Sequence, residues 1–212
     1  MSAGTGGGHG YDAVLCDLDG VIRFYDHTGV HALERAAGLA EGSTAAVAFA
    51  PENDQPLLLG RITREQWVDS IALGLAGQGV PAERARELGT AFGYAPSSAD
   101  AEVVALLRAV RKHVPLVLVT NATVWLDGDL ALLGLADLAD AVVNSSLVGV
   151  AKPDPEIYRI AADRAGVPVG RCLFVDDNEA NVEAARTAGM TGVLHRGPAD
   201  LRQALAHRPG AG

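Results

Sequence analysis

Two aspartates, Asp17 and Asp19, follow an apolar run and stand just before a glycine. The run, residues 13–16, is typical of a buried strand. If the strand continued, both side chains would lie on one face of a sheet, and Gly20 lets the chain turn away directly afterwards. Such a pair suits a nucleophile with an acid/base partner, or two oxygen ligands for a hard cation. The segment also fits an ordinary Asp- and Gly-rich loop, so its interpretation depends on the rest of the chain.

Strand and helix signals alternate through the second half of the chain. Helices are predicted at residues 103–112 and 125–135, and after the capping residues Asp154 and Asn178. Because the two kinds of element alternate, we expect an α/β fold with a doubly wound parallel sheet. Apolar runs predict its further strands at residues 116–119, 140–143, 172–175 and 191–194.

Doubly wound sheets bind ligands beyond the carboxyl ends of their strands. Thr120 and Asp176 stand at the ends of predicted strands, as Asp17 does, and Lys152 lies in a loop beyond another. These four polar side chains are therefore expected to converge on one crevice.

Residues 24–96 break the alternation and carry mostly helical signals, the clearest being the capping-box spacing of Thr63 and Gln66. A helical cap inserted after the first strand explains this. Within it, residues 48–59 are interpreted as a polar loop, either a lid or a connector. The expected division of the chain is a flexible N-terminal tail (1–10), a core (11–23 and 97–200), a cap (24–96) and a C-terminal tail (201–212).

Composition argues against several classes of protein. The net charge is -9, and the 17 Lys and Arg residues form no long basic cluster, so no nucleic-acid partner is expected. No apolar stretch reaches the ~20 residues that cross a bilayer, and residues 1–10 lack the pattern of a signal peptide. We therefore expect no membrane association and a cytoplasmic location. Cys16 and Cys172 are predicted to be buried free thiols about 10 Å apart along neighbouring strands.

The ordered segments Asp17-Leu18-Asp19-Gly20-Val21, Thr120-Asn121, Lys152-Pro153 and Asp176-Asp177 resemble the four motifs of the haloacid dehalogenase-like (HAD) hydrolase superfamily. The resemblance covers residues 12–195 and implies a Rossmann-like core. The helical insertion is similar to the first-type (C1) cap of the subgroup that includes phosphoglycolate phosphatase and β-phosphoglucomutase.

In this chemistry Asp17 is the nucleophile, which forms an aspartyl-phosphate, and Asp19 is the acid/base. Thr120 hydrogen-bonds a phosphoryl oxygen, and Lys152 neutralises negative charge. The backbone N–H groups of Asn121 and Ala122 donate further hydrogen bonds to the phosphate.

Several acidic groups around a phosphate require a hard cation, and Mg²⁺ fits. By resemblance, its ligands are the carboxylate of Asp17, the backbone carbonyl of Asp19 and a carboxylate of Asp176 or Asp177, the choice between the last two staying open. The second aspartate also favours phosphate over halide chemistry, because expelling a halide needs no proton.

The expected function is therefore a Mg²⁺-dependent phosphatase acting on a small phosphorylated metabolite, as a monomer or homodimer. A phosphosugar mutase uses the same motifs and needs further contacts from the cap. Two further alternatives are remote. A phospho-accepting signalling domain has its motifs in a different order. A binding member of the fold without turnover is unexpected, because no motif is missing. Trp125 is a candidate for stacking on substrate or for core packing. The candidates for mutase contacts are Arg23, His27, Arg61 and Arg64.

Overall fold

A parallel five-stranded sheet forms the centre of the protein in the computed structural model, which describes residues 10–206. All neighbouring strands pair in parallel, in the order β5-β4-β1-β6-β7. The three central strands are buried throughout, which explains their unbroken apolar sequences. The α/β fold expected from the sequence is confirmed. The strands are β1 (Ala13–Cys16), β4 (Leu116–Thr120), β5 (Ala141–Asn144), β6 (Cys172–Asp176) and β7 (Thr191–Leu194).

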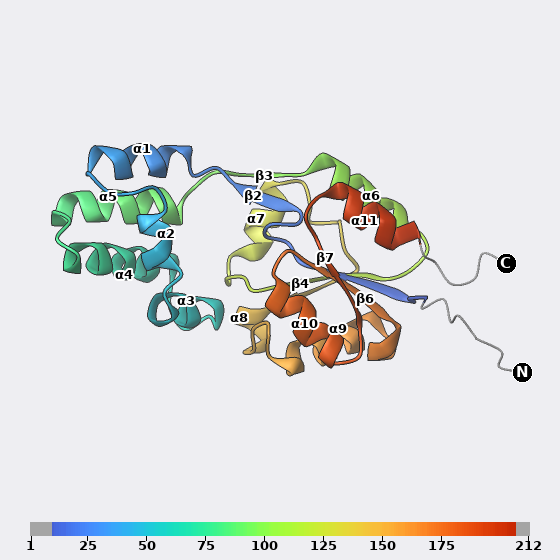
Figure 1. Cartoon of the computed structure of the whole chain (residues 1–212). Helices are drawn as coiled ribbons and strands as arrows, with labels where there is room; N and C mark the ends of the chain where they lie inside the picture. Colours follow the sequence, from blue (N-terminus) through green and yellow to red (C-terminus); the bar gives the residue numbers. More distant parts are fainter. Residues whose placement is uncertain (1–9, 207–212) are drawn as a thin grey trace, which may run out of the picture.

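Helices cover both faces of this sheet (Figure 1). Val14 and Cys16 of β1 face one layer, formed by α6 (Ala101–Arg111), α7 (Leu126–Leu132) and α11 (Pro198–Ala206). The alternate residues of β1 face the other layer, formed by α9 (Pro155–Ala165) and α10 (Glu179–Thr187). Two short helices, α8 (Ser145–Val148) and the 3-10 turn η1 (Val169–Arg171), complete the connections.

The C-terminal segment differs from the expectation of a tail beginning at residue 201. Residues 201–206 continue α11, because Leu201 is fully buried and anchors the helix in the core. Tyr11 donates a hydrogen bond to the carbonyl of Leu205 over 3.0 Å, and Arg202 pairs with Glu102 of α6. The remaining predicted tail residues, 1–9 and 207–212, lie outside the described part of the chain.

The inserted helices stand to one side of the sheet and have their own core (Figure 1). Thr63 and Gln66 form the predicted capping box at the start of α4. The segment interpreted as a polar loop is helical instead, because Pro51 occupies the first turn of a helix, where proline is favoured. The helices are α1 (Thr28–Ala36), α2 (Ser43–Ala48), α3 (Pro51–Leu58), α4 (Arg64–Gly77) and α5 (Ala82–Gly93).

A short antiparallel ribbon connects the sheet domain to these helices. Its strands are β2 (Arg23–Tyr25) and β3 (Ser97–Ala99). The sequence predicted only helix-capping residues at 97–100. Asp100 does cap α6, accepting hydrogen bonds from the N–H groups of Glu102 and Val103, but the pairing of two three-residue strands far apart in sequence left no periodic signal.

The two cysteines lie on neighbouring strands, β1 and β6. Cys16 pairs with Val175 and Cys172 with Ala13, so the two cysteines are offset by three positions on adjacent strands. Both thiols are buried and free, as predicted. Among residues 10–206, no helix has the length and apolar character required to cross a membrane.

Candidate active site

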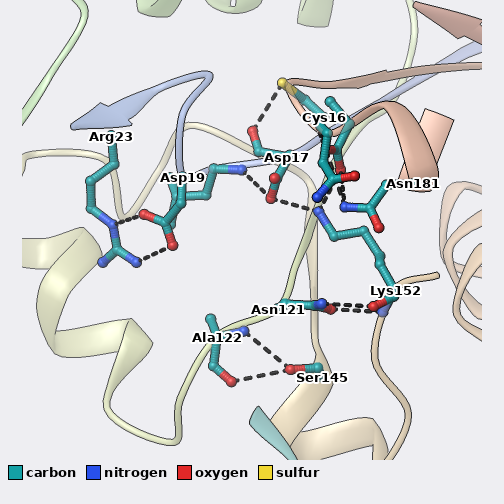
Figure 2. Close-up of polar contacts among 12 residues, drawn as sticks. Cys16, Asp17, Asp19, Arg23, Asn121, Ala122, Ser145, Lys152 and Asn181 are labelled. Carbon is teal, nitrogen blue, oxygen red and sulfur yellow. Dashed lines mark hydrogen bonds and ion pairs between the residues drawn. The ribbon is translucent and has the colours of Figure 1, made fainter. Parts of the chain in front are cut away.

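The carboxyl edge of the sheet carries the four polar side chains that the sequence placed there. Figure 2 shows two of them, Asp17 and Lys152, facing each other. Asp17 follows β1, Thr120 ends β4, Asp176 ends β6, and Lys152 reaches in from the loop after α8. All four residues are more than nine-tenths buried. Polar groups that are withdrawn from water to this extent must find partners among themselves or in a ligand.

Lys152 lies between two carboxylates. Its Nζ is 2.7 Å from Asp17 Oδ1 and 2.7 Å from Asp176 Oδ2. Burial raises the pKa of Asp17, and the ammonium of Lys152 opposes that rise. Burial also disfavours the charged lysine, but the two carboxylates outweigh it and raise the pKa of Lys152. The site therefore holds a fixed positive charge beside the proposed nucleophile.

Backbone and side-chain amides hold both carboxylates in place. The N–H of Leu18 donates to Asp17 Oδ1 over 2.7 Å. The side-chain amide of Asn181 in α10 donates to Asp176 Oδ1 and Oδ2 over 3.1 and 3.2 Å, and the N–H of Asn178 donates to its Oδ1 over 2.8 Å. Sequence reasoning recognised Asn178 as a helix cap and missed Asn181, which stands five positions after Asp176 on the first turns of a helix.

Asn121 holds the loop that carries Lys152. Its side chain donates to the carbonyl of Lys152 over 2.9 Å and accepts from the N–H of Lys152 over 2.7 Å. The Lys152–Pro153 peptide bond is cis. The sequence predicted a backbone phosphate donor at Asn121, and the structure adds a positioning role for its side chain. No local signal indicated this contact, because the partners are 31 positions apart.

Ala122 differs from the expectation that its N–H donates to phosphate. That N–H donates instead to Ser145 Oγ over 3.1 Å. The same hydroxyl lies 2.7 Å from the carbonyl oxygen of Leu58, at the end of α3. Ser145, which sequence reasoning did not single out, thus connects the loop after β4 to the inserted helices. Its hydroxyl also accepts the hydrogen bond of the Ala122 N–H that was expected to go to phosphate.

The hydroxyl of Thr120 is fully buried and has no hydrogen-bond partner among the described residues. A buried hydroxyl without a partner costs about 1–3 kcal/mol. Thr120 ends β4, the strand next to β1, at the same edge of the sheet as Asp17. This observation fits the phosphate-binding role that the sequence predicted for Thr120.

Asp17, Asp176 and Asp177 form a cluster suited to a cation. Each offers a carboxylate oxygen, and these oxygens lie within 4.8 Å of one another. Asp177 is the exposed member, and partial burial together with the charge of Asp176 raises its pKa. Three carboxylates so close repel one another, and a hard divalent cation with oxygen ligands relieves that repulsion. The donor set therefore fits Mg²⁺.

Gly20 makes room for this cluster. Its φ is +78°, a backbone conformation that residues with a Cβ rarely adopt. A Cβ at this position would also lie only 2.1 Å from Oδ2 of Asp177. The positive φ favours glycine here, and a Cβ would force the carboxylate of Asp177 to move out of the cluster.

Asp19 is engaged differently from the other acidic residues. Arg23 holds both of its oxygens, with Nε 2.6 Å from Oδ1 and Nη2 2.9 Å from Oδ2. The guanidinium of Arg23 also donates to Asp129 Oδ2 of α7 over 3.1 Å. Only the backbone carbonyl of Asp19 was expected at the metal, and its carboxylate is not a member of the acidic cluster.

A cavity of about 860 Å³ lies between the start of α4 and α7. Arg64 stands in its wall, with its guanidinium 4.4 Å from the ring centroid of Trp125 and 5.0 Å from that of Tyr94. It also lies 3.6 Å from Asp129, which connects this wall to Arg23. Trp125, considered for substrate stacking, thus packs against an arginine. Arg61 lines the cavity as well.

Comparison with known proteins identifies the family. Residues 11–189 match the family model of haloacid dehalogenase-like hydrolases. A phosphoserine phosphatase from Thermus thermophilus is 39% identical over 128 residues, covering 58% of this chain and 50% of that protein. A phosphatase from Mycobacterium tuberculosis is 39% identical over 92 residues, covering 42% of each chain. The chain thus aligns with half or less of the length of these relatives.

A solved structure has the same fold over nearly the whole chain. A HAD family enzyme from Bacteroides thetaiotaomicron, in complex with magnesium and inorganic phosphate, has a TM-score of 0.67 and 19% identity, covering 88% of this chain and 95% of that one. The matched segment contains all four polar motifs at the carboxyl edge of the sheet. This chain therefore belongs to the haloacid dehalogenase-like hydrolase family.

Proposed function

We propose that the protein is a Mg²⁺-dependent phosphatase that cleaves a small phosphoric monoester through an aspartyl-phosphate on Asp17. The observation that carries the proposal is the unpartnered, fully buried hydroxyl of Thr120 at the edge where Lys152 faces Asp17. An anion with several acceptor oxygens is the ligand that satisfies such a site. Relatives named as phosphatases support the same activity.

The first step transfers the phosphoryl group to the protein. An oxygen of Asp17 attacks phosphorus, the bond from phosphorus to the leaving oxygen breaks, and Asp19 gives that oxygen a proton. Lys152 and the hydroxyl of Thr120 stabilise the charge on the phosphoryl oxygens. Because Lys152 and the N–H of Leu18 both contact Asp17 Oδ1, the orientation of the nucleophilic carboxylate is fixed before substrate binds.

The second step releases phosphate. Asp19 takes a proton from water, the water oxygen attacks phosphorus, and the bond to Asp17 breaks. Asp17, the backbone carbonyl of Asp19 and Asp176 or Asp177 would hold Mg²⁺, and its positive charge would offset the repulsion between these carboxylates and the phosphate. Asp176 is already paired with Lys152 and Asn181, whereas Asp177 is exposed.

The contacts around Arg23 and His27 favour a phosphatase over a mutase. Arg23 is engaged by Asp19 and Asp129, and the ring of His27 stacks on Phe92 with centroids 4.9 Å apart. The guanidinium of Arg23 is therefore occupied within the protein, and stacking on Phe92 fixes the plane of the His27 ring. Arg61 and Arg64 remain at the cavity wall.

The test is the Mg²⁺-dependent release of phosphate from p-nitrophenyl phosphate by purified variants. Asp17→Asn should abolish turnover. Asp19→Asn should nearly abolish it, because release of phosphate from Asp17 needs Asp19 as the base whatever the leaving group. Chelation of Mg²⁺ should stop the parent protein. Asp12→Asn is the matched control, because Asp12 pairs with Arg171 at the opposite end of β1. Undiminished turnover of the Asp17 or the Asp19 variant would refute the proposal.

A further inference from the structure

The carboxylate of Asp19 is held by a buried arginine. Figure 2 shows it turned toward Arg23, while the carboxylate of Asp17 points to Lys152. The side chain of Arg23 is only 4% exposed, whereas that of Asp19 is 38% exposed. A two-point contact between guanidinium and carboxylate fixes orientation as well as distance. In this arrangement both oxygens of the proposed acid/base are already occupied.

The local backbone keeps this pair together. The N–H of Gly20 donates to the carbonyl of Arg23 over 3.0 Å, and the N–H of Arg23 donates to the carbonyl of Leu18 over 2.7 Å. The turn after β1 therefore presents Arg23 directly opposite Asp19. Arg23 is also the first residue of β2, the strand of the ribbon that leads from the sheet to the inserted helices.

A second carboxylate is ready to receive the guanidinium. Asp129 Oδ2 lies 3.1 Å from Nη1 of Arg23, so the arginine keeps an ion pair even without Asp19. Breaking a buried pair is costly when one charge is left without a partner. Asp129 removes much of that cost, and Asp19 can therefore turn away while Arg23 stays in place.

We propose that Arg23 is a positioning residue that holds Asp19 in a resting orientation away from Asp17, and that Asp129 retains the guanidinium when Asp19 turns toward substrate. This inference rests on the phosphatase function proposed above. The resting orientation competes with the productive one, and it lowers the apparent efficiency of any step that uses Asp19.

The leaving group makes this effect measurable. Phosphoryl transfer to Asp17 from an alkyl phosphate needs a proton from Asp19, whereas p-nitrophenolate leaves without one. The ratio of kcat/KM for ethyl phosphate to kcat/KM for p-nitrophenyl phosphate therefore reports how readily Asp19 reaches the leaving oxygen. General damage to the fold lowers both values together and does not change the ratio.

The experiment compares this ratio in three variants with the parent protein. Arg23→Met releases Asp19 and should raise the ratio about fivefold or more, as expected for losing charged hydrogen bonds. Asp129→Asn weakens the alternative partner of Arg23 and should lower the ratio. Arg171→Met is the matched control, since Arg171 forms the same two-point contact with Asp12 at the far end of β1, and its ratio should equal the parent value.

An unchanged or lower ratio in Arg23→Met overturns the inference, and so does an unchanged or higher ratio in Asp129→Asn. If Arg23→Met does not fold, as judged by its thermal melt, the Asp129 variant alone decides. Asp19→Asn separates the two levels of the argument. If it leaves the ratio at the parent value, the acid role in the proposed function fails. If it collapses the ratio while the other variants behave as the parent does, only the role of Arg23 fails.

Discussion

Replacement of Asn121 by alanine should impair catalysis, although the side chain of Asn121 is not assigned a contact with substrate. The side chain makes two hydrogen bonds to the backbone N–H and carbonyl of Lys152, 2.7 and 2.9 Å long. Each is worth about 0.5–1.5 kcal/mol, so Asn121→Ala should lower the free energy of unfolding by about 2 kcal/mol. For a chain of this length, that corresponds to a fall in Tm of roughly 4–8 °C.

The loss of activity should exceed what this destabilisation explains. Once its loop is free to move, Lys152 no longer holds its position between Asp17 and Asp176. Because a misplacement of about 1 Å at a reacting centre costs up to about 10²-fold, we expect kcat to fall by about 10- to 100-fold. The assay is Mg²⁺-dependent hydrolysis of p-nitrophenyl phosphate at a temperature well below both melting points, with Tm followed by circular dichroism.

Asp140→Ala is a suitable control for this experiment. The carboxylate of Asp140 accepts from the N–H of Leu116 over 2.9 Å and from Arg111 over 2.9 Å, at the opposite edge of the sheet. This variant should also lose stability, but its kcat should equal that of the parent. A parent-like kcat for Asn121→Ala would refute the reasoning, because Lys152 would then be held in place without Asn121.

Three further predictions follow from single features of the structure. Gly20→Ala should weaken the apparent affinity for Mg²⁺, measured by metal titration of activity, because its Cβ would lie 2.1 Å from Asp177 Oδ2; an unchanged titration midpoint would contradict this. Thr120→Val removes a buried hydroxyl without a partner, so Tm should rise or stay level while kcat/KM falls about 10²-fold, and a large loss of stability would show that the hydroxyl is already satisfied. Burial raises the pKa of Asp54 from its ordinary 3.8 to about 6, so ionising this half-buried carboxyl destabilises the fold progressively between those pH values and fully above them. Asp54→Asn should therefore stabilise the protein by about 1 kcal/mol at pH 7, because the half-exposed carboxylate is partly screened by solvent. Near pH 3 the substitution should have no such effect. Thermal melts at the two pH values measure the difference.

The sheet and the placement of the four motifs could be predicted because their signals are local. A buried parallel strand needs an unbroken apolar run, and Leu116–Thr120 and Cys172–Asp176 have that pattern directly before or around their polar ends. Helix caps are equally local, since the side chains of Asp154 and Asn178 contact the N–H group two residues further on.

The features that sequence reasoning missed depend on partners distant in the chain. The β2–β3 ribbon pairs Arg23 with Ala99, and Ser145 lies against the carbonyl of Leu58. Residues 51–58 have a polar composition typical of a loop, yet they form α3, with Leu57 buried in the core of the inserted helices. Such contacts are decided by tertiary packing, which overrides the local preference.

The pairing of Asp19 with Arg23 is the most consequential omission in the site. Sequence reasoning assigned the aspartate to proton transfer and considered the arginine for substrate contact. Both residues stand in one turn four positions apart, with opposite charges, a spacing that could have suggested their contact. The i,i+4 spacing brings charged side chains together on a helix, whereas here Gly20 and the turn that follows it bring them together.

The strand order has a consequence for local stability. β1 is the middle strand of five, and β4 and β6, which carry Thr120 and Asp176, are its two neighbours. Opening of a sheet begins at its edges, so fraying of β5 or β7 leaves the pairing of these three strands intact. The amides of Val14 to Cys16 should therefore be among the slowest in the chain to exchange with deuterium. The proposed nucleophile thus follows the part of the sheet that we expect to open last, while the proposed movement of Asp19 takes place in the turn beyond it.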